Sequence, residues 1–159
     1  MAMGKTMNIT LGTSPVRTPP SPHEDSDSCD DVERPLVLQQ VLADLMQLSD
    51  ELGSTHVKVA EIWNSLGLIR LHMQHNVQAA VKCHCEALSI YRLNKEASTL
   101  DIAVTLNDLG RCYERLGEPN KALSTYEEAA EMVRNDTSIR RTHSVVESVN
   151  RAVARLRRA

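Results

Sequence analysis

The sequence predicts an all-α protein, and three observations support this. Six stretches carry apolar residues at steps of three and four, the spacing of amphipathic helices, and no strand-like alternation competes with them. Only 3% of the 159 residues are aromatic and phenylalanine is absent, so the core must be aliphatic, which suits closely packed helices. Two stretches also repeat each other about 43 residues apart, Leu66-Gly67 being echoed by Leu109-Gly110 and Ala79-Ala80 by Ala122.

Residues 1–34 differ from the rest of the chain and predict a disordered tail. Proline follows serine or threonine three times between residues 13 and 22, and residues 23–33 are acidic with little to bury. Serines and threonines beside prolines or among acids are candidate phosphorylation sites, although such pairs are common in disordered tails. The candidates are Ser14, Thr18, Ser21, Ser26 and Ser28.

From Pro35 onward the pattern changes and predicts a helix over residues 35–52. Apolar residues such as Val41, Leu45 and Leu48 recur at helical spacing. Pro35 suits the first turn of a helix, and Gly53 suits the position just past its end.

Two helical hairpins and a final helix follow, so that residues 35–158 form one helical domain. The hairpins cover residues 56–92 and 99–134, with Gly117 in the second turn and Pro119 opening the helix after it. The final helix, residues 138–157, is apolar on one side and rich in arginine elsewhere, which is typical of a helix that caps a stack of helices.

The second hairpin resembles a tetratricopeptide repeat. In the first hairpin Arg70 stands where an aromatic residue is usual and Gln74 where a turn glycine is usual, so it matches less closely. The resemblance implies a short right-handed α-solenoid of such hairpins, in which residues 35–52 are a half-hairpin and residues 138–157 the C-terminal capping helix. The residues that carry it are Leu109, Gly110, Tyr113, Ala122, Tyr126 and Ala129.

The repeat is longer than the common version of about 34 residues. The additional residues fall between hairpins, and the segment Leu52-Gly53-Ser54-Thr55-His56-Val57-Lys58-Val59-Ala60 is similar to one in the kinesin light chain class of long repeats. The heptad-rich region that would bind a motor heavy chain is absent from this sequence.

The resemblance implies that the first helix of each hairpin lines a concave groove that binds peptides. Asn64 and Asn107 occupy the same repeat position, where an amide can both donate to and accept from a peptide backbone. The alternative is that these are solvated side chains on an exposed helix face. The predicted groove residues are Asn64, Leu68, Leu71, His72, Val104, Asn107, Asp108, Arg111, Glu114 and Arg115.

The sequence predicts no metal site, no cofactor and no enzyme. His72, His75, Cys83, His84 and Cys85 are potential ligands, but Cys83 and Cys85 diverge by roughly 200° on a helix and cannot share an ion. No nucleophile–base arrangement can be placed either. No apolar run is long enough to span a membrane and no secretory signal is visible, so we expect a cytoplasmic protein with reduced cysteines.

The leading interpretation is therefore a non-enzymatic interaction module, an adaptor or scaffold, that binds a peptide or helix of a partner protein in its groove. The alternative is a structural subunit of a larger assembly, or a homodimer that pairs through the first helix. In that case the groove is permanently filled, and the protein's own N-terminal tail is one candidate to fill it. Binding of RNA or of an anionic membrane through the C-terminal arginines is less favoured, because the net charge of −3 gives no bulk attraction.

Overall fold

The computed structural model describes residues 30–139 and 143–158, with side chains from residue 36 onward. These residues hold six α-helices and no strand, which confirms the all-α prediction. The helices are α1 (Asp30–Leu52), α2 (Val57–His72), α3 (Val77–Leu93), α4 (Thr99–Arg115), α5 (Pro119–Asn135) and α6 (Ser144–Leu156). None of them has the length and apolar character needed to cross a lipid bilayer.

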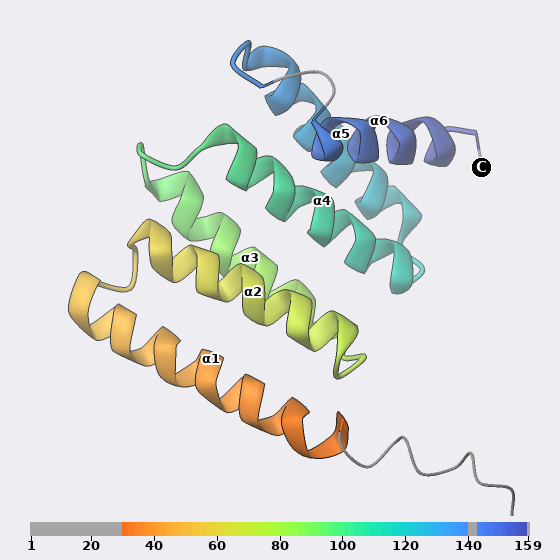
Figure 1. Ribbon diagram of the computed structural model, residues 1–159. Helices are drawn as coiled ribbons and strands as arrows, with labels where there is room; N and C mark the ends of the chain where they lie inside the picture. Colours follow the sequence, from red (N-terminus) through yellow and green to blue (C-terminus); the bar gives the residue numbers. More distant parts are fainter. Residues whose placement is uncertain (1–29, 140–142, 159) are drawn as a thin grey trace, which may run out of the picture.

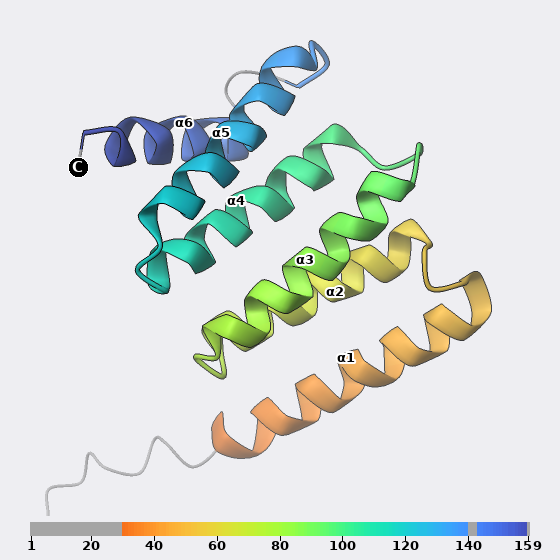
Figure 2. The same ribbon diagram turned by 180° about the vertical axis from the view of Figure 1, so that it is seen from behind.

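The helices stack in chain order as a short solenoid (Figure 1). The pairs α2–α3 and α4–α5 pack most extensively and are the two hairpins, while α3 packs on α4 and α5 on α6. Seen from the front, α2, α4 and α6 form one layer (Figure 1), and from behind α3 and α5 lie nearest the viewer (Figure 2). The first helices of successive hairpins therefore share one face of the molecule.

Local signals fix where the hairpin helices begin and end. The side chains of Asn76 and Ser98 accept hydrogen bonds from backbone N–H groups in the first turns of α3 and α4, at 3.0 and 3.1 Å. Gly117 has a φ of +72° in the turn before Pro119, a conformation that suits glycine. The turn between α2 and α3 is one residue longer, and there His75 takes the left-handed conformation, with a φ of +50°.

Each hairpin is held together by a ring packed on a glycine. A Cβ atom on Gly67 would lie 2.6 Å from the His84 ring, and one on Gly110 would lie 2.7 Å from the Tyr126 ring. Tyr126 and His84 are themselves at most 1% exposed. These glycines are therefore required by close approach of a ring from the second helix of the same hairpin.

The first and last helices differ from their expected bounds. α1 begins at Asp30 rather than at residue 35, in keeping with the acidic residues at its start, which favour a helix N-terminus. α6 begins at Ser144 rather than at residue 138. The Asp136 carboxylate accepts the Ser138 backbone N–H at 2.9 Å in a turn, and His143 caps α6 by accepting the Val145 backbone N–H at 3.3 Å.

Candidate functional site

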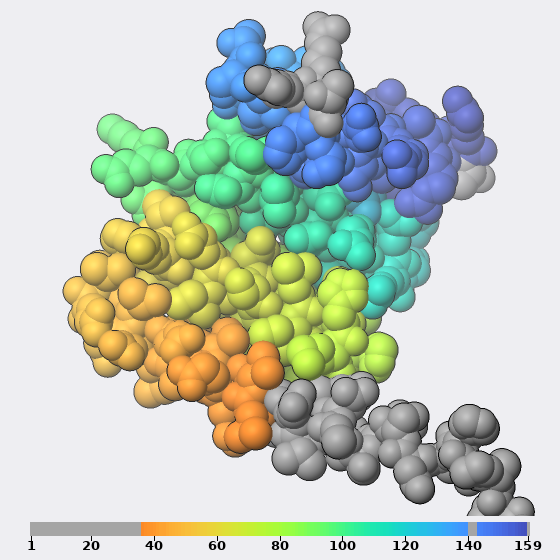
Figure 3. Space-filling view, viewed as in Figure 1, coloured from red at the N-terminus to blue at the C-terminus, as the bar shows by residue number. Residues whose placement is uncertain are grey.

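The face shared by α2, α4 and α6 is turned toward the viewer in Figure 3. The predicted groove residues belong to α2 and α4. Most of them lie at the surface. His72, Arg111 and Arg115 are exposed, and Asn64, Leu68, Val104, Asn107 and Glu114 are partly exposed.

Two of the predicted residues, Leu71 and Asp108, are buried. Leu71 is 0% exposed because it packs with Ala80 of α3 and Cys112 of α4, so it contributes to the core rather than to a ligand surface. Asp108 is 6% exposed, and its carboxylate oxygen accepts a 3.3 Å hydrogen bond from Arg111. Burial raises the pKa of the Asp108 carboxyl, and the neighbouring Arg111 offsets only part of that shift.

Both predicted amides are already engaged within the protein. The Asn64 oxygen lies 2.6 Å from His84 Nδ1, and the Asn107 oxygen accepts a 3.0 Å hydrogen bond from the Ser148 hydroxyl of α6. Each amide oxygen therefore uses one of its two acceptor positions inside the protein, which reduces what the amide can offer to a bound peptide.

His84 is an internal residue rather than a potential metal ligand. Its ring is fully buried, and its Nε2 atom has no hydrogen-bond partner among the described residues. Burial lowers the pKa of His84 to about 4, helped by the positive charge of Arg111. Across the described part of the chain, no three His, Cys, Asp or Glu side chains lie close enough together to hold a metal ion.

Sequence reasoning missed the contribution of α6 to this face. A hollow of about 350 Å³ opens between α4 and α6. Four of its lining residues come from α6, and they are Ser148, Arg151, Ala152 and Arg155. The full lining is Arg111, Glu114, Arg115, Tyr126, Ser148, Arg151, Ala152 and Arg155.

The signal for α6 lies in the repeat spacing. The buried residues of α6 follow those of α4 at 43-residue intervals, so α6 takes the place of the first helix of a third hairpin and must share the groove face. Asn150 continues the series of Asn64 and Asn107 at the same interval. The matching buried residues are Val145, Val146, Val149 and Ala152 in α6, and Ile102, Ala103, Leu106 and Leu109 in α4.

Glu114, which is partly exposed, links the three helices around the hollow. One of its carboxylate oxygens accepts a hydrogen bond from the Tyr126 hydroxyl at 2.7 Å, and the other lies 2.7 Å from an Arg155 nitrogen. Burial, together with this bond to Glu114, raises the pKa of Tyr126, so the phenol stays protonated as a donor. These contacts join α4, α5 and α6 at one point.

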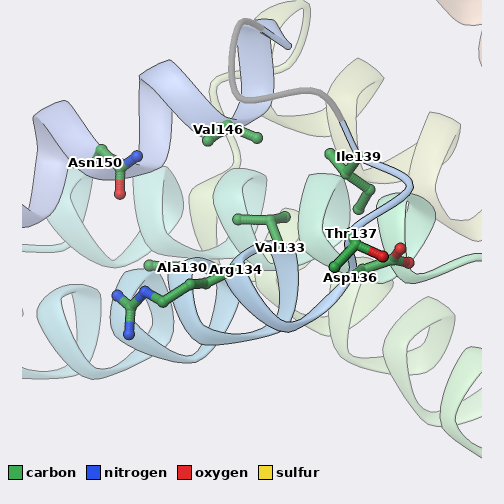
Figure 4. A pocket seen from close by; sticks show the side chains of 8 residues that line it. All are labelled: Ala130, Val133, Arg134, Asp136, Thr137, Ile139, Val146 and Asn150. Atoms are coloured by element: carbon green, nitrogen blue, oxygen red, sulfur yellow. The ribbon is translucent and has the colours of Figure 1, made fainter.

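Two further hollows lie outside this face. One of about 680 Å³ lies between α5 and α6, where Val133 and Val146 face each other across it (Figure 4). The other, of about 520 Å³, lies between α1 and α3 and includes Met46 and Leu93. The candidate phosphorylation sites Ser14, Thr18, Ser21, Ser26 and Ser28 lie outside the described residues.

Residues 58–135 match the family model of the tetratricopeptide repeat. The match covers α3, α4 and α5 fully and all of α2 except its first residue, so it includes the two hairpins with their ring-on-glycine packing. No curated protein matches the chain.

Proposed function

We propose that the protein, whose residues 58–135 match the tetratricopeptide repeat, is a non-enzymatic adaptor that binds a peptide or helix of a partner protein on the face of α2, α4 and α6. Tetratricopeptide repeats generally mediate contacts between proteins, and stacked repeats offer an extended concave binding surface. The 43-residue register, which continues into α6, supports placing the chain in the long-repeat, kinesin-light-chain-like class. The free thiols of Cys83, Cys85 and Cys112 support a reduced, cytoplasmic setting.

The observation that carries this proposal is the placement of Leu68. Its side chain is partly exposed on α2 and belongs to neither of the two apolar clusters that form the core of the described residues. It lies on the groove face, one helical turn from Asn64 on one side and from His72 on the other. An apolar side chain flanked by polar donors is what a peptide needs for both affinity and orientation.

The test compares two matched variants. Leu68→Glu places a charge in the groove, whereas Leu93→Glu places the same charge on α3, where the leucine is 73% exposed. Peptides are first selected from a random library on the unmodified protein, and their affinities for all three proteins are then measured by fluorescence polarisation. We expect Leu68→Glu to weaken binding by roughly 1.5–3 kcal/mol, about tenfold or more, and Leu93→Glu to leave it unchanged.

Equal affinity of the two variants, when both melt like the unmodified protein, would refute groove binding. A library that yields no binding peptide would favour the second candidate, a structural subunit or homodimer. That candidate rests on α1, where Leu36, Val37 and Met46 are exposed, Met46 by 69%. Sedimentation over a range of concentrations tests it, because Met46→Glu should shift a self-associating protein toward monomer.

A further inference from the structure

The hollow between α4 and α6 carries more positive than negative charge. Four of its lining residues are arginines. Arg155 pairs with Glu114 at 2.7 Å, and Arg111 pairs with Asp108 at 3.3 Å. Arg115 reaches only a neutral acceptor, the Leu71 carbonyl oxygen at 3.3 Å, and Arg151 has no ion pair among the described residues. Within the described part of the chain, two guanidinium groups thus remain without a paired carboxylate.

The arginines are arranged as two facing rows. Arg111 and Arg115 lie one turn apart on α4, and Arg151 and Arg155 lie one turn apart on α6. A guanidinium group presents planar donors that match a carboxylate with two parallel hydrogen bonds. The hollow between the rows, about 350 Å³, is large enough for acidic side chains of a peptide lying along the groove.

Resting on the proposed groove function, we propose that this hollow binds side-chain carboxylates of an acidic segment in the partner protein. The Arg115 and Arg151 side chains supply the two uncompensated charges, and the paired Glu114 holds Arg155 in place beside them. RNA fits the site less well, because single-stranded bases need exposed aromatic rings for stacking. Tyr126 is the one aromatic residue that lines the hollow, and it is 1% exposed.

The experiment measures binding of a fluorescein-labelled peptide of alternating glutamate and glycine, with a glutamine-for-glutamate peptide as the neutral control. The test variant is Arg115→Gln/Arg151→Gln, which breaks no ion pair among the described residues. The matched control is Lys82→Gln/Arg134→Gln, which removes the same charge from α3 and α5 away from this hollow. We expect the test variant to bind roughly tenfold more weakly and the control to bind like the unmodified protein.

Two further results are expected. Rising salt should weaken the interaction, and the neutral peptide should not bind. Equal affinity of test and control variants would overturn the proposal, as would a single-stranded RNA probe that binds through Arg115 and Arg151 when the acidic peptide does not.

The outcome separates this inference from the groove function itself. If the acidic peptide fails while library peptides still depend on Leu68, the groove function stands and the acidic partner is wrong. If library peptides depend on Leu68 and the acidic peptide depends on Arg115 and Arg151, the groove function and the acidic partner both stand. If neither dependence is found, both proposals are wrong.

Discussion

Acidification should destabilise this protein through one buried histidine. His84 is fully buried, with its ring on Gly67 and its Nδ1 atom 2.6 Å from the Asn64 oxygen. Protonation would add a second N–H with no acceptor and a positive charge facing Arg111. The folded state therefore resists a proton that the unfolded chain accepts freely.

The size of the effect follows from the two pKa values. The His84 pKa falls from 6.5 to about 4 in the folded state, so the unfolded state binds more protons between these values. The contribution of His84 is constant above pH 6.5, declines as the pH falls through this window, and is lost below about 4. A shift of this size corresponds to a loss of roughly 3 kcal/mol, a large part of the stability of a small domain.

Urea unfolding followed by circular dichroism at a series of pH values measures this loss. The matched control is His84→Gln, whose amide is neutral throughout and can still bond to Asn64. His56 and His143 cap helices by accepting backbone N–H groups, and both residues are present in the two proteins, so the contribution of these caps cancels in the comparison. If the unfolding free energies of the two proteins decline in parallel between pH 6.5 and 4, the reasoning about His84 is refuted.

Three further substitutions test the packing of the second hairpin, each by urea unfolding. Gly110→Ala should cost about 1–3 kcal/mol because its Cβ would lie 2.7 Å from the Tyr126 ring; an unchanged midpoint would show that the ring can move. Tyr126→Phe removes the 2.7 Å bond to Glu114 and should cost about 1 kcal/mol, and no loss would mean that water replaces the hydroxyl. Asp108→Asn should be neutral or stabilising at pH 7, since burial raises the pKa of Asp108, and its advantage should shrink as the pH falls; a large loss at pH 7 would mean that the pair with Arg111 outweighs burial.

The helices of the two hairpins were predictable because their signals are local. Apolar spacing, the N-cap Ser98 and the turn residues Gly117 and Pro119 act within a few residues of the element they define. The start of α6 was not predictable, because Asp136 forms a turn within a stretch whose apolar spacing also suits a helix. The start of α1 was not predictable either, because Pro35 suits the first turn of a helix as well as the acidic residues before it do.

The groove was harder to predict at the level of single residues. Repeat position places Leu71 and Asp108 on the inner face. Whether a side chain there stays exposed depends on how closely the first helix of the following hairpin approaches. That distance is not encoded by the residues near Leu71 or Asp108. The packing of the His84 ring on Gly67 could be predicted only by comparison with the second hairpin. Tyr126 follows Gly110 by 16 residues, and His84 follows Gly67 by 17, because the turn of the first hairpin is one residue longer.

The stacking order also bears on how the molecule would respond to force. α1 packs on α2 alone among the described helices, and each later helix touches mainly its neighbours in the chain (Figure 1). Such a stack has no contact that clamps its two ends together, so tension would peel it from α1 inward in small steps rather than break it all at once. The protein would then behave as an extensible link, lengthening before it releases what is tied to either end.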